Sequence, residues 1–397
     1  MSITLPTMNS EELLADIRRI APEMVEIRRQ IHAHPELAFE ETRTSELVAR
    51  KLAEWGYKVE RGIGGTGVVG QLRRGDGPAR LGIRADMDAL PIVERTGLPY
   101  ASTVHGKMHA CGHDGHTAIL LCAAKYLAEH GRFNGTLNLV FQPAEENEGG
   151  ALRMIEDGLF DKYPCDGIYA LHNTPGLPVG QMAMSAGAIM ASFDRVTIEL
   201  QGVGAHGAMP HHGVDPMQCA ASIVLGLQSL VSREVDAQRA AVVTVGSVQC
   251  GEVFNIVPER AILKLGVRCL EPSVRTQLER RIRVFVEAQA QSYGLSSSVE
   301  YDQRYPVLVN RPDNTELARQ VAIGLLGTEQ VLEREPTMGS EDFAYMLQVV
   351  PGAYVRLGNG VGKDGGCMVH NPGYDFNDEA LPLGAAYWIR LAQAVLA

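Results

Sequence analysis

One thiol and three imidazoles lie close together in the segment MHACGHDGHTAILL, residues 108–121. Cys111 and His113 directly precede an apolar run with helical spacing, and glycines beside them let the backbone bend tightly. A lone cysteine in such a place is more often a small core residue. Next to His113, however, its thiolate completes a pair of donors that suits zinc, manganese or cobalt. The segment therefore indicates a metal site at the start of a helix.

Other potential metal donors follow predicted strands or lie in a loop bounded by glycine and proline. They are Asp86, Asp88, Glu145, Glu146, His172 and His370. In an open parallel sheet, ligands bind beyond the carboxyl ends of the strands, so we expect these side chains to meet at one edge. This set, together with Cys111 and His113, is large enough to hold two cations.

The adjacent acids Glu145 and Glu146 are expected to have two different roles, metal binding and proton transfer. Repulsion between two free buried carboxylates would leave one protonated, whereas one can bind metal while its neighbour transfers protons. Each of these residues also has an alternative without a role in catalysis. Paired glutamates are usually solvated, and His172 could be a core imidazole. We expect His109 and His116 to support the ligands rather than bind metal themselves.

The first 190 residues alternate helical and extended patterns, which indicates an α/β fold with a mostly parallel sheet flanked by helices. The predicted helices are 44–55, 116–130 and 150–160, and the predicted strands are 66–72, 79–85, 136–141 and 167–172. The same alternation resumes after residue 306.

Between these two parts the order becomes strand, helix, strand, strand, helix, strand, which is the ferredoxin-like α+β order. The predicted elements are 193–202, 215–232, 241–249, 261–269, 274–294 and 296–303. We therefore predict a catalytic domain of residues 1–190 and 306–397, interrupted by an inserted domain of residues 191–305.

Composition narrows the class of protein. The chain has 397 residues and a formal net charge of −11, which disfavours binding to a nucleic-acid backbone. No apolar run approaches the roughly 18 residues that a membrane helix needs. Its seven cysteines show no CxxC spacing, so a disulfide framework is not expected. Charged residues stand where a signal peptide needs an apolar stretch, and we expect a cytoplasmic protein.

Eight motifs, in order along the chain, resemble the amidohydrolase branch of the aminoacylase and carboxypeptidase family of two-metal peptidases. That branch includes hippurate hydrolases, indoleacetyl-amino-acid hydrolases and N-acetyldiaminopimelate deacetylases. The motifs are RRQIHAHPELAFEE, RADMDALP, HACGHDGHTA, FQPAEE, ALHNTPGLPVG, GVGAHGAMPHHGVDP, FNIVPE and MGSEDFAYML. The resemblance extends from about residue 25 to the C-terminus.

The resemblance implies roles for individual residues. The implied metal ligands are Cys111, His113, Glu146, His172 and His370. Glu145 would be the general base and acid, and Asp88 an orienting carboxylate. The inserted domain would form a homodimer or tetramer, with His206 reaching the partner's active site. Asn255 and Arg268 would bind the substrate near its carboxylate.

Two departures from the pattern of other branches stand out. Those branches carry His-x-Asp where this chain has Asp86-Met87-Asp88, so Cys111 and His113 must compensate for a missing histidine. Many relatives also have Gly-Thr-x-Arg where this chain reads Leu-Gly-Val-Arg, so the residues before Arg268 depart from that pattern.

The combined expectation is an enzyme that hydrolyses the amide bond of N-acyl amino acids with two divalent ions. Zinc or manganese suits the donors best, and cobalt or nickel is also compatible. The alternative enzymatic function is that of a metallo-carboxypeptidase or dipeptidase, which applies the same chemistry to short peptides. The rival outside enzymes is a binding protein that kept the fold and lost the chemistry.

Overall fold

The computed structural model describes residues 10–146 and 148–397, which group into two compact units. The first unit contains the described residues up to Gly187, together with Val309–Glu335 and Tyr345–Ala397. The second contains Ala188–Leu308 and Pro336–Ala344. That the second unit serves dimerisation stays a prediction.

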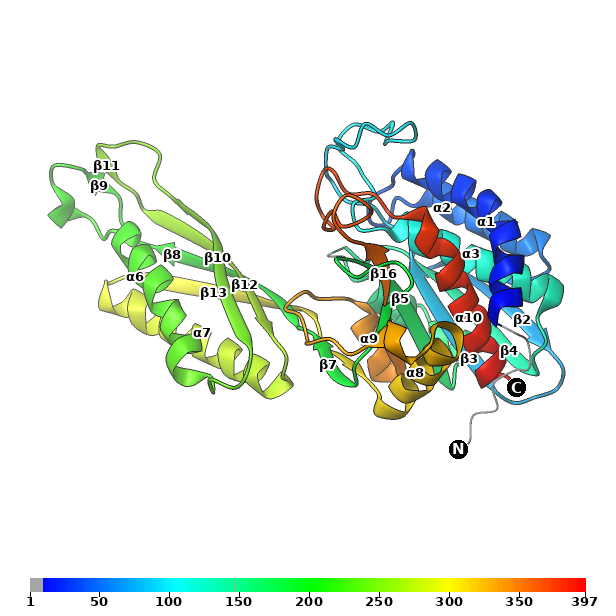
Figure 1. Ribbon diagram of the computed structural model, residues 1–397. Coiled ribbons are helices and arrows are strands. Elements are labelled where there is room, and N and C mark those ends of the chain that lie inside the picture. Colours follow the sequence, from blue (N-terminus) through cyan, green and yellow to red (C-terminus); the bar gives the residue numbers. More distant parts are fainter. Residues whose placement is uncertain (1–9, 147) are drawn as a thin grey trace. The chain divides into compact units, whose positions relative to one another are not determined.

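An eight-stranded sheet forms the centre of the first unit in the described part of the chain (Figure 1). Its strands, in spatial order, are β1 (Lys58–Ile63), β2 (Gly67–Arg74), β4 (Gly135–Gln142), β3 (Arg80–Asp86), β5 (Gly167–Pro175), β16 (Gly352–Gly360), β6 (Met182–Ala183) and β15 (Val331–Leu332). The four strands from β4 to β16 are parallel to one another, whereas β1, β2 and β6 introduce antiparallel pairs. The predicted α/β fold with a mostly parallel sheet is confirmed.

Helices bury this sheet, which explains why its central strands are apolar without alternation. Every residue of β4 is buried, as a strand covered on both faces requires. The helices of this unit include α1 (Ser10–His32), α2 (Thr42–Glu54), α3 (His113–His130), α8 (Pro312–Leu326), α9 (Phe343–Val349, which crosses into the second unit at its start) and α10 (Leu381–Val395). α1 packs on α3 and α10, and α3 lies against β3, β4 and β5 (Figure 1). α3 and α10 are apolar on nearly all sides because they are buried among these neighbours.

Three features of the first unit were not predicted from the sequence. The long helix α1 was not predicted, and it contains Pro22. The helix predicted over 150–160 is two short helices, α4 (Gly150–Glu156) and α5 (Leu159–Lys162), because Gly158 adopts a left-handed conformation between them. β2 and β3 follow one another in sequence but are separated in the sheet by β4.

The second unit has the predicted ferredoxin-like order. Its antiparallel sheet runs β10 (Ala241–Cys250), β12 (Arg260–Cys269), β8 (Phe193–Gln201) and β13 (Ser296–Tyr305), with α6 (Pro216–Ser229) and α7 (Pro272–Ser292) packed on it. β8 alternates buried and partly exposed residues, as expected for a strand with one face against helices. A small pair of strands, β9 (Ala205–His206) and β11 (Ile256–Val257), joins two loops.

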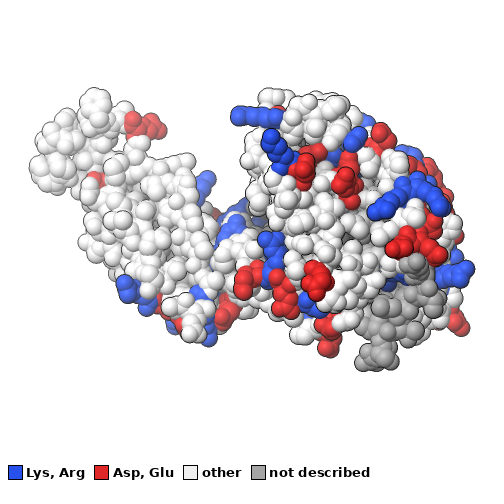
Figure 2. Space-filling model, in the orientation of Figure 1, with Lys and Arg blue, Asp and Glu red and all other residues white. Residues whose placement is uncertain are grey.

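Charges are mixed over the visible surface of the first unit. Figure 2 shows acidic and basic side chains interspersed there rather than gathered by sign. Within residues 10–146 and 148–397, no helix combines the length and apolar character needed to cross a membrane.

Candidate active site

The predicted site residues of the first unit gather at one end of its parallel strands. Asp86 ends β3, the two glutamates follow β4, and His172 lies in the last part of β5. Gly112, in the left-handed conformation at φ 93°, turns the chain sharply into α3. A side chain at Gly112 would collide with Asn173 and Tyr374, so glycine is required there.

The predicted ligands form overlapping groups whose donor atoms lie within 4.8 Å of one another. The groups are Cys111 with His113 and His172, Cys111 with Glu146 and His370, and His113 with Glu145 and Glu146. Cys111 Sγ is 3.3 Å from His172 Nε2, and His370 Nε2 is 3.1 Å from Glu146 Oε1. The structure thus brings all five predicted ligands and Glu145 into one cluster.

Polar partners on the far side of the imidazoles set their orientation. His113 Nδ1 is 3.2 Å from Asp88 Oδ1, and the other oxygen of Asp88 accepts the Glu146 N–H at 2.9 Å. His172 Nδ1 donates to the carbonyl of Asn173 at 2.6 Å. Both rings therefore present Nε2 to the cluster, in the way that metal-binding histidines are commonly held.

The donors fit a divalent cation. His113 Nε2 is buried and has no hydrogen-bond partner among the described residues, as expected for an atom that binds a cation. Burial lowers the pKa of His113, but the Asp86 and Asp88 carboxylates raise it to about 10, so the surroundings favour positive charge here. Burial keeps the pKa of His172 well below its usual range, which leaves the neutral imidazole that binds metal.

The thiol of Cys111 also faces negative groups. Burial, and then the charges of Glu146 and Glu145, raise its pKa well above the usual range. A cation would reverse this balance, because it stabilises the thiolate and separates the carboxylates.

A second layer of buried polar residues lies under the cluster. His116 Nδ1 is 2.6 Å from Asp86 Oδ1, and its Nε2 is 2.7 Å from Asn173 Oδ1. Arg84 donates to the other oxygen of Asp86 at 2.7 Å. Sequence reasoning overlooked Arg84 and Asn173, although an arginine inside the apolar strand LGIRA is a signal of a buried charge pair.

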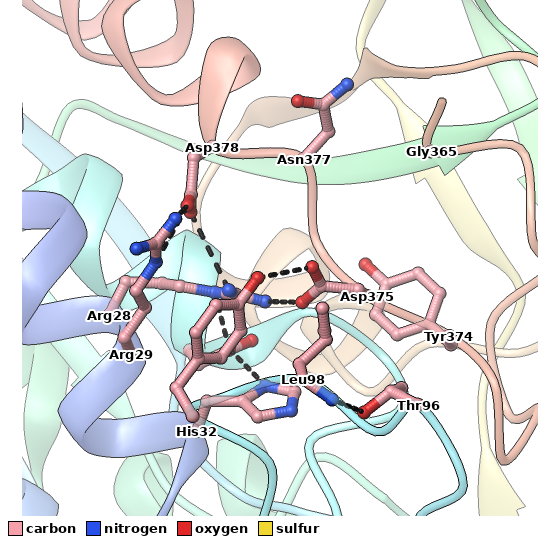
Figure 3. Close-up of polar contacts among 12 residues, drawn as sticks. Arg28, Arg29, His32, Thr96, Leu98, Gly365, Tyr374, Asp375, Asn377 and Asp378 are labelled. Atoms are coloured by element: carbon pink, nitrogen blue, oxygen red, sulfur yellow. Dashed lines mark hydrogen bonds and ion pairs between the residues drawn. The ribbon is translucent and has the colours of Figure 1, made fainter. Parts of the chain in front are cut away.

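A further network anchors the start of α3. Arg28 is fully buried, with its Nε 2.8 Å from Asp114 Oδ2, the same oxygen that lies 2.8 Å from His32 Nδ1. Figure 3 shows Arg28 also contacting Asp375 and Asp378. Because Asp114 directly follows His113, this network holds the backbone that carries a predicted ligand.

His206 and Asn255 lie together in the second unit. Pairing of β9 with β11 brings their loops side by side, and the Asn255 carbonyl accepts the Gly207 N–H at 2.8 Å. The exposed His206 side chain accepts the Ala208 N–H at Nδ1, 3.0 Å away, and this hydrogen bond does not use Nε2. The roles of both residues stay predictions.

Arg268 is not brought to Asn255 within one chain. Asn255 lies before β12, and Arg268 is eight residues beyond Arg260, the first residue of that strand. The extended strand therefore places Arg268 roughly 25 Å from its start, where the loop of Asn255 ends. The Arg268 guanidinium donates to the Met338 carbonyl at 2.9 Å and lies over the Phe193 ring.

Comparisons with known proteins identify the family of this chain. Residues 82–394 match the family model described as peptidase family M20/M25/M40. A hippurate hydrolase of Campylobacter jejuni is 43% identical, over 96% of this chain and 98% of that protein. An N-acetyl-L-cysteine deacetylase of Bacillus subtilis is 37% identical, over 96% and 90%.

A solved structure gives the same result. The crystal structure of the Bacillus subtilis YXEP protein, described as a dinuclear metal binding peptidase from the M20 family, superimposes with a TM-score of 0.82 at 34% identity. The alignment covers 96% of this chain and 99% of that one. The chain belongs to peptidase family M20/M25/M40.

Proposed function

We propose that this protein hydrolyses the amide bond of N-acyl amino acids, releasing a carboxylic acid and a free amino acid. The observation that carries the proposal is the cluster of five donor side chains, two of which, His113 and Glu146, lie beside the buried glutamate Glu145. The similarity to a hippurate hydrolase and an N-acetyl-L-cysteine deacetylase supports this class of substrate.

We assign the binding of two divalent cations to the side chains of Cys111, His113, Glu146, His172 and His370. Such ions lower the pKa of water and polarise a carbonyl oxygen. The thiol and imidazoles favour zinc, while the carboxylates also accept manganese, cobalt or nickel. Reconstitution of chelated protein with each metal in turn, followed by activity measurement, identifies the preferred ion.

Glu145 has the position for proton transfer. Its carboxylate lies within 4.8 Å of donor atoms of His113 and Glu146. There it would accept a proton from the attacking water and later donate it to the departing amine nitrogen, so that the proton is conserved through the reaction. His206 would donate a hydrogen bond to the oxyanion that forms at the acyl carbon.

The substrate carboxylate would be bound by Asn255 and Arg268. Because Asn255 lies before the start of β12 and Arg268 lies near its end, they can contact one small molecule only if they come from two chains. This supports a homodimer in which the loop of His206 and Asn255 reaches the partner's site.

A cytoplasmic location of the protein stays a prediction.

A substrate panel tests the function. Benzoyl-, acetyl- and indoleacetyl-amino acids should be hydrolysed with higher kcat/KM than dipeptides built from the same amino acids. Glu145→Gln should retain its metal and lose turnover by about 100-fold or more. Faster cleavage of dipeptides would favour the peptidase alternative, and full activity of Glu145→Gln would remove Glu145 from the base role.

Two further variants test the remaining assignments. Cys111→Ala should lose metal and activity together, and a fully metallated, active variant would refute its role as a ligand. His206→Ala should lower kcat, because the hydrogen bond to the oxyanion is lost. Mixing His206→Ala with Glu145→Gln should then restore activity in the mixed dimers, each of which has one intact site.

A further inference from the structure

Glu41 is a fully buried glutamate whose side chain makes no capping hydrogen bond to the helix that follows it, α2. It occupies the position before the first residue of that helix. The nearby Glu36 caps α2 instead, because its two carboxylate oxygens accept the N–H groups of Arg43 and Thr44, each at 2.9 Å. The end of α2 therefore gives no reason for a buried acid at position 41.

The carboxylate of Glu41 instead reaches the loop that carries the proposed base. Its Oε1 accepts the Ala144 N–H at 2.9 Å, across 103 positions of sequence, and its Oε2 accepts the Thr66 hydroxyl. Burial, together with the nearby charge of Asp88, raises the pKa of Glu41 to about 7. A carboxylate in these surroundings costs folding free energy, so packing alone does not account for it.

Ala144 has an unusual backbone conformation. It adopts a φ of 54°, the left-handed region, which is unfavourable for a residue with a side chain. The N–H of Ala144 is held by Glu41, and its carbonyl accepts the Gly150 N–H at 3.0 Å. Both peptide groups that flank this strained residue are thereby fixed.

The next two residues are the proposed base and a proposed ligand. The N–H of Glu146 is held by Asp88 at 2.9 Å, just as that of Ala144 is held by Glu41. Glu145 thus lies between two backbone groups, each bound to a buried carboxylate. A small rotation at Ala144 would swing the Glu145 side chain out of the cluster.

We propose that Glu41 is a positioning residue that holds Ala144 in its left-handed conformation and so aims Glu145 at the substrate. The proposal rests on the proposed function, because it assumes that Glu145 transfers the proton. Without the acceptor at Glu41, the Ala144 N–H is left buried and unpaired, and the strained residue relaxes. The loss of Glu41 should therefore lower kcat, which reports the chemical step, and leave substrate binding unchanged.

Glu41→Leu and Glu41→Gln separate positioning from packing. Leucine removes the acceptor and keeps the bulk, so we expect kcat to fall by about 10- to 100-fold. KM and the metal content should stay near the parental values. Glutamine keeps an acceptor for Ala144 and should retain most of kcat. Glu40→Leu is the control, since Glu40 is the exposed neighbour at the same helix start and should leave kcat unchanged.

A backbone rescue gives a readout that a general loss of stability would not give. Glycine adopts positive φ without strain, so adding Ala144→Gly to Glu41→Leu should recover part of the lost kcat. Should Glu41→Leu not fold, Thr66→Val keeps Glu41 and removes the other hydrogen bond that holds its carboxylate in place for Ala144. We expect a several-fold lower kcat from it with metal content unchanged.

Several results would overturn the proposal. They are parental kcat in Glu41→Leu or in Thr66→Val, an equal loss in Glu41→Gln and Glu41→Leu, or a loss of metal that accompanies the loss of kcat. Failure of the proposed function looks different, because the parental protein would then be inactive on every N-acyl amino acid or Glu145→Gln would be fully active.

Discussion

Replacing Arg28 with methionine should destabilise the first unit far more than the same change at its neighbour Arg29. Arg28 is completely buried and contacts the carboxylates of Asp114, Asp375 and Asp378. Arg29 contacts Asp378 at 2.8 Å, but 39% of its side chain is exposed. The two arginines are adjacent in sequence and share an acidic partner, so they form a matched pair.

The difference in burial between Arg28 and Arg29 determines how much each substitution lowers the free energy of unfolding. Methionine at position 28 leaves the Asp114 carboxylate, which is fully buried, without its strongest cationic partner, and removal of one member of such a pair costs about 3–5 kcal/mol. An exposed ion pair contributes about 0–1 kcal/mol, so Arg29→Met should cost no more than that. The difference between the two variants should therefore be at least about 2 kcal/mol.

Urea unfolding measures this difference in the relevant unit. The two tryptophans of the chain, Trp55 and Trp388, both lie in the first unit, so their fluorescence reports its unfolding. A destabilisation by Arg28→Met that lay within about 1 kcal/mol of that by Arg29→Met would refute the reasoning. It would mean that Asp114 does not depend on the buried arginine for its charge.

Three further predictions concern pH, packing and metal removal. Burial lowers the pKa of His32, but Asp114 and Glu94 raise it to about 9, so its proton stabilises the fold below pH 6.5 and this contribution is lost as pH rises through 9. The stability difference between the parent and His32→Gln should shrink by on the order of 1–3 kcal/mol over that range in urea titrations, and a constant difference would contradict it. Gly115→Ala should cost about 1–3 kcal/mol in the same assay, because a Cβ there would lie 2.3 Å from the Phe376 ring; parental stability would show that the ring moves freely. Chelation should lower the thermal midpoint and abolish activity, both restored by zinc or manganese, whereas an unchanged midpoint would show that no bound metal stabilises the fold.

Much of the arrangement at the strand ends could be predicted from sequence. Apolar strands followed directly by acids or histidines place those side chains at one edge of a parallel sheet, which is where Glu145, Glu146 and His172 lie. The ferredoxin-like order of the second unit was also readable, because each of its strands and helices carries its own periodicity.

The residues that hold the site in place could not be read in this way. Glu41 contacts Ala144 across 103 positions, and His32 contacts Asp114 across 82, so no local pattern links the partners. The left-handed conformation of Ala144 also has no sequence signal, since alanine rarely adopts it. Contacts of this kind depend on how the whole unit packs.

The central claim is that five side chains hold two cations beside Glu145. Diffraction from crystals of the metal-loaded protein, recorded at the absorption edge of the metal, tests it most directly. The account predicts two anomalous peaks per chain, both within bonding distance of donors among Cys111, His113, Glu146, His172 and His370. A single peak, or peaks away from these residues, would contradict it.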